Sequence, residues 1–201
     1  MINFISIDKS EPLLYFKKLY EEAHSLKQEY IEAICISSYN KNINKVRSRF
    51  VNLKYVKEDK FYFFSNYESQ KSKDFLSNNQ VSITIFWSKT NTQIRIEGCV
   101  HRATQEESDS HFKGRSIEKN ALAISSMQSK KIASYEDVNK KYIKTINSIK
   151  NKSSINRPVY WGGFYVKPNK IEFWEGHENR INKRQEYKKV DSGWSKYFLE
   201  P

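Results

Sequence analysis

The sequence of 201 residues contains no long hydrophobic run and only two cysteines. Because no stretch of about 18 apolar residues occurs, we expect no segment that spans a membrane. The first residues, Met1 to Phe4, show no basic region ahead of an apolar one, so no secretory signal is expected. Cys35 and Cys99 lie in strand-like runs, which favours reduced core residues over a disulfide, as in a cytoplasmic protein. No spacing of Cys and His is typical of zinc, and no metal is expected.

Acidic residues are outnumbered, with 23 Asp and Glu against 35 Lys and Arg, and the net charge is +12. A basic protein attracts nucleic acids, but it attracts phosphorylated small molecules equally well. The basic residues are spread along the chain, no recognition-helix or RNA-binding motif is present, and the aromatic residues fall in strand-core positions. We therefore expect no nucleic-acid partner. A non-enzymatic basic protein that binds nucleic acid stays open as an alternative.

Apolar periodicity predicts about eight strands, with helices at the start, in the middle and before the last hairpins. A helix is expected over about 11–30, because apolar residues recur at helical spacing and Pro12 suits a first turn. A capping-box pattern, Thr104 to Glu107, predicts a helix to about Lys113. The other expected strands are 33–38, 47–56, 61–65, 81–87 and 92–103, and further helices begin near Ser69 and Ser134.

The segment 157–184 has two aromatic-rich runs, Tyr160–Val166 and Ile171–Trp174, on either side of Lys167–Lys170. Pro and Asn in the middle are turn formers, so these runs predict a β-hairpin. Gly162 and Gly163 indicate that another backbone or a ligand comes close to the first strand. A last strand pair, 185–190 and 194–199, is expected around Asp191–Gly193.

The order of these elements shows no βαβ alternation, no internal repeat and no linker long enough to separate domains. We therefore expect a single domain over 1–201, mainly β with peripheral helices (α+β), built as an antiparallel barrel or split barrel. The helix near Ser69 brings Lys71 and Lys73 into its first turns, where backbone N–H groups and the helix dipole favour a phosphate. An ordinary surface helix with a Ser cap is the alternative.

Several motifs in a fixed order resemble the pyridoxamine 5′-phosphate oxidase family from about Pro12 to Pro201. They are Arg49-Phe50-Val51-Asn52-Leu53-Lys54, Phe64-Ser65-Asn66 with Ser69-Gln70-Lys71, Gln128-Ser129, Trp161-Gly162-Gly163-Phe164, and Ile171-Glu172-Phe173-Trp174 with Arg180 and Arg184. The resemblance implies an FMN-binding split barrel in a homodimer. It also implies one flavin mononucleotide (FMN) at each of two sites between subunits, and a dimerisation and hairpin region over about 157–201.

The resemblance also implies the cofactor contacts. They fall on Arg49, Lys54, Phe64, Ser65, Gln70, Lys71, Gln93, Gln128, Ser129, Trp174 and Arg184. Ser65 stands where the family usually has Thr, which keeps the hydroxyl. Gln70 stands where many members have Arg, which removes one cation from the phosphate site. Charge-assisted hydrogen bonds suit a phosphate dianion, and side-chain amides suit the pyrimidine edge of a flavin.

The substrate contacts implied by the resemblance fall on Lys54, His111, Arg115, Lys119, Arg180 and Asn182, of which the last two are the candidate catalytic residues. Three of them depart from the family pattern. His111 replaces a usual Tyr, Lys119 a usual Ser and Asn182 a usual His. An amide does not exchange a proton near neutral pH as an imidazole does.

The function expected from the resemblance is FMN-dependent oxidation of pyridoxamine or pyridoxine 5′-phosphate to pyridoxal 5′-phosphate, with O2 as acceptor and H2O2 as product. The expected partner is a phosphorylated pyridine-ring compound. The departures at His111, Lys119 and Asn182 favour an alternative, a related FMN oxidase acting on a different ring substrate, as in phenazine biosynthesis.

Overall fold

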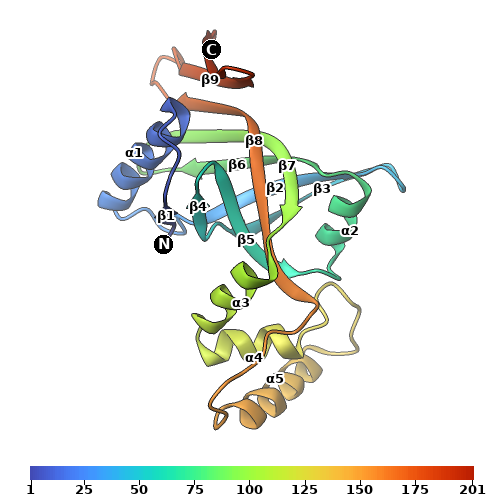
Figure 1. Ribbon diagram of the computed structural model, residues 1–201. Coiled ribbons are helices and arrows are strands. Elements are labelled where there is room, and N and C mark those ends of the chain that lie inside the picture. The colour runs from blue at the N-terminus through green and yellow to red at the C-terminus, as the bar shows by residue number, and fades with distance from the viewer.

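The structure, a computed structural model, describes all residues 1–201 and has one large sheet with helices at its periphery (Figure 1). The strands are β1 (Asn3–Ile5), β2 (Ala33–Asn40), β3 (Lys45–Asn52), β4 (Tyr55–Lys57), β5 (Lys60–Asn66), β6 (Gln80–Trp87), β7 (Thr92–Arg102), β8 (Trp161–Glu175), β9 (Lys183–Val190) and β10 (Gly193–Leu199). The helices are α1 (Glu11–Ser25), α2 (Gln70–Ser77), α3 (Gln105–Lys113), α4 (Ile117–Ser125) and α5 (Tyr135–Ile149). None of the helices has the length and apolar character needed to cross a membrane.

The sheet has ten strands in the order β1-β4-β5-β8-β7-β6-β2-β3, and β9 adds to β8 and pairs with β10. Every pair is antiparallel except β1 with β4. The mixed α+β class and the mostly antiparallel sheet are thus confirmed, with two more strands than expected. The capping box that starts α3 and the last strand pair, β9 with β10, are confirmed as well. Cys35 and Cys99 are both free and only partly buried.

The predicted hairpin over residues 160–174 is wrong. β8 runs as one strand from Trp161 to Glu175 and pairs with β7 from Phe164 to Glu175. The register shifts at Gly98, opposite Pro168, which has no N–H to donate and is tolerated at such a bulge. A Cβ on Gly98 would lie 2.2 Å from the carbonyl oxygen of Lys167, so the glycine permits the close approach of the two backbones. Lys167–Lys170 is therefore a bulge within one strand.

The close approach expected at Gly162 and Gly163 is present, but side chains rather than a backbone or a ligand make it. A Cβ on Gly162 would lie 2.2 Å from the hydroxyl of Tyr67, and one on Gly163 would lie 2.9 Å from the ring of Phe64. The two glycines thus make room for aromatic rings from β5 and the residue after it.

The predicted strand 47–56 is also wrong, because the chain changes partners in its middle. The amide of Leu53 donates to the carbonyl of Glu32 at 2.8 Å, and the next amide, Lys54, donates to Tyr62 at 2.8 Å. β3 therefore pairs with β2, whereas β4 pairs with β5. Likewise, the first helix ends at Ser25 rather than near Tyr30.

The main core lies between α1 and the sheet. Phe16 of α1 is fully buried and packs edge-on against Phe61, with ring centroids 5.2 Å apart, and near Trp87 at 5.8 Å. A second, smaller cluster joins Phe112, Ala123 and Trp161. It fixes α3 and α4 against the start of β8 at one end of the sheet (Figure 1). This second cluster forms part of the frame of the site described next.

Candidate functional site

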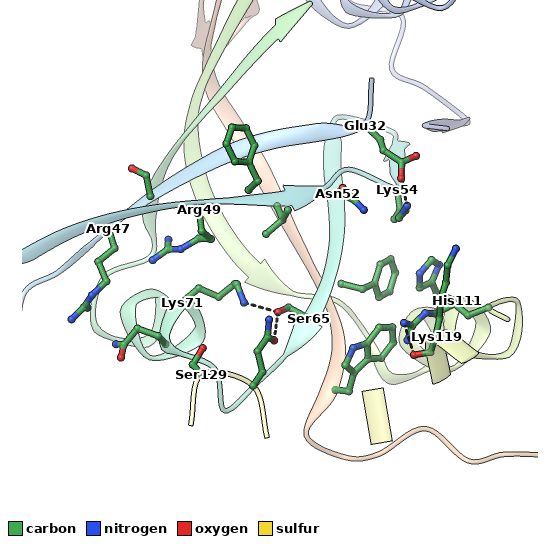
Figure 2. A pocket seen from close by; sticks show the side chains of 18 of the residues that line it. Glu32, Arg47, Arg49, Asn52, Lys54, Ser65, Lys71, His111, Lys119 and Ser129 are labelled. Carbon is green, nitrogen blue, oxygen red and sulfur yellow. Dashed lines mark hydrogen bonds and ion pairs between the residues drawn. The ribbon is translucent and has the colours of Figure 1, made fainter. Parts of the chain in front are cut away.

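A cavity of about 1020 Å³ opens between β3, β5, α2 and the α3–α4 region. Most of the predicted cofactor and substrate residues line it: Arg49, Lys54, Phe64, Ser65, Gln70, Lys71, His111, Arg115, Lys119, Gln128 and Ser129. Figure 2 shows Arg47, Arg49 and Lys71 toward one side of the cavity. Lys54, His111 and Lys119 lie toward the other side. We call these the Lys71 end (Arg47, Arg49, Ser65, Gln70, Lys71, Ser129) and the Lys54 end (Glu32, Lys54, His111, Arg115, Lys119).

Lys71 is the buried cation of the Lys71 end, with only 7% of its surface exposed. Its Nζ donates to the hydroxyls of Ser65 at 2.8 Å and Ser69 at 3.2 Å, and no carboxylate pairs with it. Burial, and then the charge of Arg49, lower the pKa of Lys71 to about 8. Gln128 accepts from the Ser65 hydroxyl at 3.0 Å, which places its amide beside the same group. The predicted second cation of this helix, Lys73, is exposed and does not line the cavity.

Asp74, one turn along α2, organises the arginines of the Lys71 end. It is fully buried, and its Oδ2 accepts from Arg49 Nη2 at 3.1 Å while its Oδ1 accepts from Arg47 Nη1 at 2.8 Å. Gln70 Nε2 lies 3.3 Å from the same Oδ1. Burial by itself would raise the pKa of Asp74, but hydrogen bonds from Asn40 and Gln70 and the charge of Arg47 outweigh it and lower the pKa. The carboxylate is therefore ionised and holds both guanidinium groups in place.

The Lys54 end carries three cations and one carboxylate. Lys54 Nζ pairs with Glu32 Oε1 at 2.6 Å. Arg115 donates to the backbone carbonyl of Lys119 at 2.9 Å, but its buried Nη1 has no hydrogen-bond partner. The guanidinium of Arg115 lies over the ring of Trp161, with its Cζ 4.3 Å from the ring centroid. An unsatisfied buried donor is costly, so this end of the cavity favours an anionic or acceptor-rich ligand.

Aromatic rings form a wall at the Lys54 end. His111 stacks on Phe64, with ring centroids 3.6 Å apart, and Trp161 continues the stack 5.7 Å from Phe64. The hydroxyl of Tyr55 lies 2.5 Å from His111 Nδ1. Burial, and then the neighbouring cations, lower the pKa of His111 to about 4. The imidazole is therefore neutral near pH 7, and it is held by Tyr55 at one nitrogen.

Five predicted site residues lie outside this cavity: Gln93, Trp174, Arg180, Asn182 and Arg184. Gln93, Trp174 and Arg184 are direct cross-strand neighbours on β7, β8 and β9. Trp161 and Trp174 are thirteen residues apart on β8, a span of roughly 40 Å for an extended strand. One chain therefore holds the predicted residues as two separate groups.

The second group is itself ordered. Arg184 Nε donates to the buried carboxylate of Glu172 at 2.9 Å. Arg180 has a φ of 61°, a left-handed conformation that is uncommon for a residue with a side chain. Asn182 Oδ1 accepts from the backbone amide of His177 at 3.1 Å, and this hydrogen bond closes the loop that presents Arg180.

Sequence reasoning missed four contributors to the cavity, namely Glu32, Arg47, Tyr55 and Asp74. Arg47 carried a signal, because it stands two residues before Arg49 and thus on the same face of a strand. Glu32 and Asp74 carried none, since their partners Lys54 and Arg47 are distant in the sequence.

Comparison with known proteins identifies the family. A family profile described as pyridoxamine 5′-phosphate oxidase matches residues 21–148. A second, described as the pyridoxine 5′-phosphate oxidase C-terminal dimerisation region, matches residues 161–201. The pyridoxine/pyridoxamine 5′-phosphate oxidase of Leptospira biflexa is 36% identical over 191 residues, covering 95% of this chain and 89% of the relative. That of Leptospira interrogans is 33% identical over 193 residues, covering 96% and 89%.

Solved structures share the fold. PhzG from Burkholderia lata, in complex with tetrahydrophenazine-1-carboxylic acid, matches with a TM-score of 0.89 at 21% identity over 98% of this chain and all of that one. A pyridoxamine 5′-phosphate oxidase-related, FMN binding protein from Nostoc punctiforme matches with a TM-score of 0.79 at 14% identity over 97% of this chain and all of that one. The profiles and the sequence relatives establish that this chain belongs to the pyridoxamine 5′-phosphate oxidase family.

Proposed function

We propose that the protein is an FMN-dependent oxidase that converts pyridoxamine 5′-phosphate or pyridoxine 5′-phosphate to pyridoxal 5′-phosphate, with O2 as acceptor and H2O2 as product. The observation that carries this proposal is the division of one cavity into two cationic ends, one of which is walled by stacked aromatic rings. Two planar ligands that each carry a phosphate, a flavin nucleotide and a pyridoxine-type vitamer, match that arrangement.

The Lys71 end fits the phosphate of FMN. A buried ammonium without a carboxylate partner is costly, and Lys71 has only hydroxyl partners. A phosphate beside Lys71 and Arg49 would relieve that cost and accept charge-assisted hydrogen bonds from both. Ser65 and Ser129 add hydroxyls at the same end, and the Nε2 group of Gln128, whose oxygen is bound by Ser65, can donate to the polar edge of the ring.

The Lys54 end fits the phosphate of the substrate. Arg115 offers its unpaired Nη1, and Lys54 and Lys119 add two further cations. The neutral imidazole of His111 is a hydrogen-bond donor or acceptor rather than a cation. These groups bind and orient the substrate, so that the carbon to be oxidised is held against the cofactor.

Bound FMN would supply the two-electron oxidation chemistry, which amino-acid side chains do not provide. The chain's own residues bind the two phosphates, hold the two rings against each other and exclude water from the cavity. Arg180 and Asn182 are proposed to lie over the substrate ring, where the guanidinium polarises the reacting group. The amide of Asn182 then acts by holding the loop rather than by moving a proton.

A homodimer is part of this proposal, because a single chain keeps the predicted residues in two groups. Trp174, Arg180 and Arg184 fall within the region matched by the dimerisation profile, residues 161–201, and Gln93 pairs with Trp174 across β7 and β8. A second copy would bring its Trp174, Arg180 and Arg184 to the cavity of the first. Each active site would then be completed by residues of both chains.

The alternative, oxidation of a different ring compound as in phenazine biosynthesis, is favoured by the residues at His111, Lys119 and Asn182. The charge at the Lys54 end argues against it. Lys54, Arg115 and Lys119 together with Glu32 leave a surplus of two positive charges. A phosphate monoester carries nearly two negative charges near neutral pH, whereas a ring compound with one carboxylate carries one.

An anaerobic titration of the FMN-loaded protein with pyridoxamine 5′-phosphate tests the proposal. We expect the yellow flavin band to bleach, to return on admission of air, and pyridoxal 5′-phosphate to accumulate. Pyridoxamine without its phosphate is the matched control and should bleach the band far less readily. A protein that holds FMN but stays yellow with pyridoxamine and pyridoxine 5′-phosphates would contradict the substrate, and bleaching by a reduced phenazine carboxylate would then support the alternative.

A further inference from the structure

We infer that Arg47, held by the buried carboxylate of Asp74, is a further phosphate-binding residue for the cofactor. This inference rests on the proposed function, since it assigns the Lys71 end of the cavity to the phosphate of FMN. Neither residue is among those indicated by the family resemblance.

Arg47 lies on the side of β3 that faces α2, where its guanidinium reaches Asp74. Alternate residues of a strand point to the same side, so Lys45, Arg47 and Arg49 share one face. Arg47 and Arg49 both line the cavity, whereas Lys45 is exposed and lies outside it. Figure 2 shows the two guanidinium groups on the same side of the cavity as Lys71. The strand thus delivers a second arginine beside the first.

Asp74 holds Arg47 in a fixed orientation. Its Oδ1 accepts from Arg47 Nη1 at 2.8 Å, and its Oδ2 accepts from Arg49 Nη2 at 3.1 Å. The carboxylate is fully buried and further bound by Asn40 Nδ2 at 2.9 Å and Ser38 Oγ at 3.2 Å, so it has little freedom to move. A guanidinium has five N–H donors, and this contact uses only one of those on Arg47. The remaining donors are available to a ligand.

The charge that Arg47 adds completes the balance of the Lys71 end. Arg47, Arg49 and Lys71 carry three positive charges, and the single carboxylate behind them, Asp74, leaves a surplus of two. A phosphate monoester near neutral pH carries close to two negative charges, so the surplus matches the ligand. Without Arg47 the surplus would be one.

Gln70 contacts the same carboxylate as Arg47. Its Nε2 lies 3.3 Å from Asp74 Oδ1, the oxygen that Arg47 also contacts, but it carries no charge. Gln70 therefore offers a hydrogen bond where a cation would strengthen phosphate binding, and Arg47 from the neighbouring strand supplies that cation. Asp74 is a positioning residue, because it acts on the phosphate only through the arginines.

The test compares FMN with riboflavin, which has the same ring but no phosphate. Flavin is removed from the full-length protein, and the Kd of each flavin is measured from the quenching of its fluorescence. In Arg47→Gln we expect the Kd for FMN to rise about tenfold or more, as for a lost charge-assisted hydrogen bond, while the Kd for riboflavin changes less than about twofold. Lys45→Gln removes the same charge from the same face of β3, and it should leave both constants within about twofold of the wild type.

Two results would overturn the inference, and they differ from a failure of the proposed function. If Arg47→Gln weakens FMN and riboflavin equally, or weakens neither, Arg47 serves the fold and not the phosphate. Arg47→Lys keeps the positive charge at this position. The assignment is supported if Arg47→Lys still binds FMN more tightly than riboflavin and Arg47→Gln does not. If the wild type binds FMN no more tightly than riboflavin, the proposed function itself fails at this end of the cavity, and the inference fails with it.

Discussion

Replacing Lys71 with Met should make the flavin-free protein more stable and at the same time weaken FMN binding. Burial lowers the pKa of this lysine from 10.5 to about 8, and a tenfold change in a proton equilibrium is worth about 1.4 kcal/mol. Keeping the ammonium charged therefore costs the folded protein about 3 kcal/mol near neutral pH. Loss of its hydrogen bonds to Ser65 and Ser69 offsets roughly half of the gain. We expect a net gain of about 1–2 kcal/mol, or roughly 3–6 °C in Tm for a chain of this size.

The stability gain expected for Lys71→Met depends on pH. Between pH 8 and 10.5 the unfolded chain binds more protons at Lys71 than the folded chain does, so the stability of the wild type rises with pH there. The advantage of Lys71→Met should therefore be full below pH 8 and fade above it. For FMN the expected loss is about 1.5–3 kcal/mol, a rise in Kd of about tenfold or more.

Thermal melts of flavin-free protein at pH 7 and pH 9.5, together with fluorescence titration with FMN, measure both parts. Lys73→Met is the matched control, because Lys73 is exposed on the same helix and should change neither quantity. The reasoning would be refuted if Lys71→Met is less stable than the wild type without flavin, or if it binds FMN as tightly. Either result would mean that Lys71 is not a buried cation kept for binding a phosphate.

Three further changes test other parts of the structure. Burial lowers the pKa of His111 to about 4, so the wild type loses stability as the pH falls from 6.5 toward 4. In His111→Phe we expect Tm to fall less steeply over this pH range, and an equal slope of Tm against pH in variant and wild type would refute this. Gly98→Ala should lower Tm by several degrees, since its Cβ would lie 2.2 Å from a backbone carbonyl, whereas Gly114→Ala, whose nearest neighbours lie at 3.7 Å, should not. Arg180→Ala should leave the Kd for FMN unchanged yet slow bleaching of the flavin band by pyridoxamine 5′-phosphate; loss of flavin would instead make Arg180 structural.

Local patterns predicted the elements that depend on neighbouring residues. The capping box at Thr104 and the strand pair around Asp191–Gly193 are confirmed, because each is decided within a few residues. The strand 47–56 and the hairpin 160–174 were wrong for the opposite reason. At Leu53 the chain changes partners, and at Pro168 a bulge against Gly98 accommodates the turn-forming residues within a continuous strand. Both outcomes depend on strands far away in the sequence.

In the site, too, some residues were predictable from the sequence and others were not. Residues implied by the family resemblance, such as Lys71 and Arg115, line the cavity, and their grouping was predictable from that resemblance. The carboxylates that set their electrostatics were not. Asp74 reaches Arg47 across 27 residues and Glu32 reaches Lys54 across 22, so no spacing rule connects them. Only the fold shows that both arginines at the Lys71 end pair with a single buried carboxylate, Asp74.

The placement of these charges also bears on why the chain is so basic. Each end of the cavity has a surplus of two positive charges, and together they account for four of the net +12. Glu32 is the only carboxylate that lines the cavity, so this surplus has no partner within the chain. Like charges held together in a partly buried site repel one another, and ligands that bring two dianions would remove that repulsion. Under the proposed function, a third of the net charge would therefore be balanced by two phosphorylated small molecules.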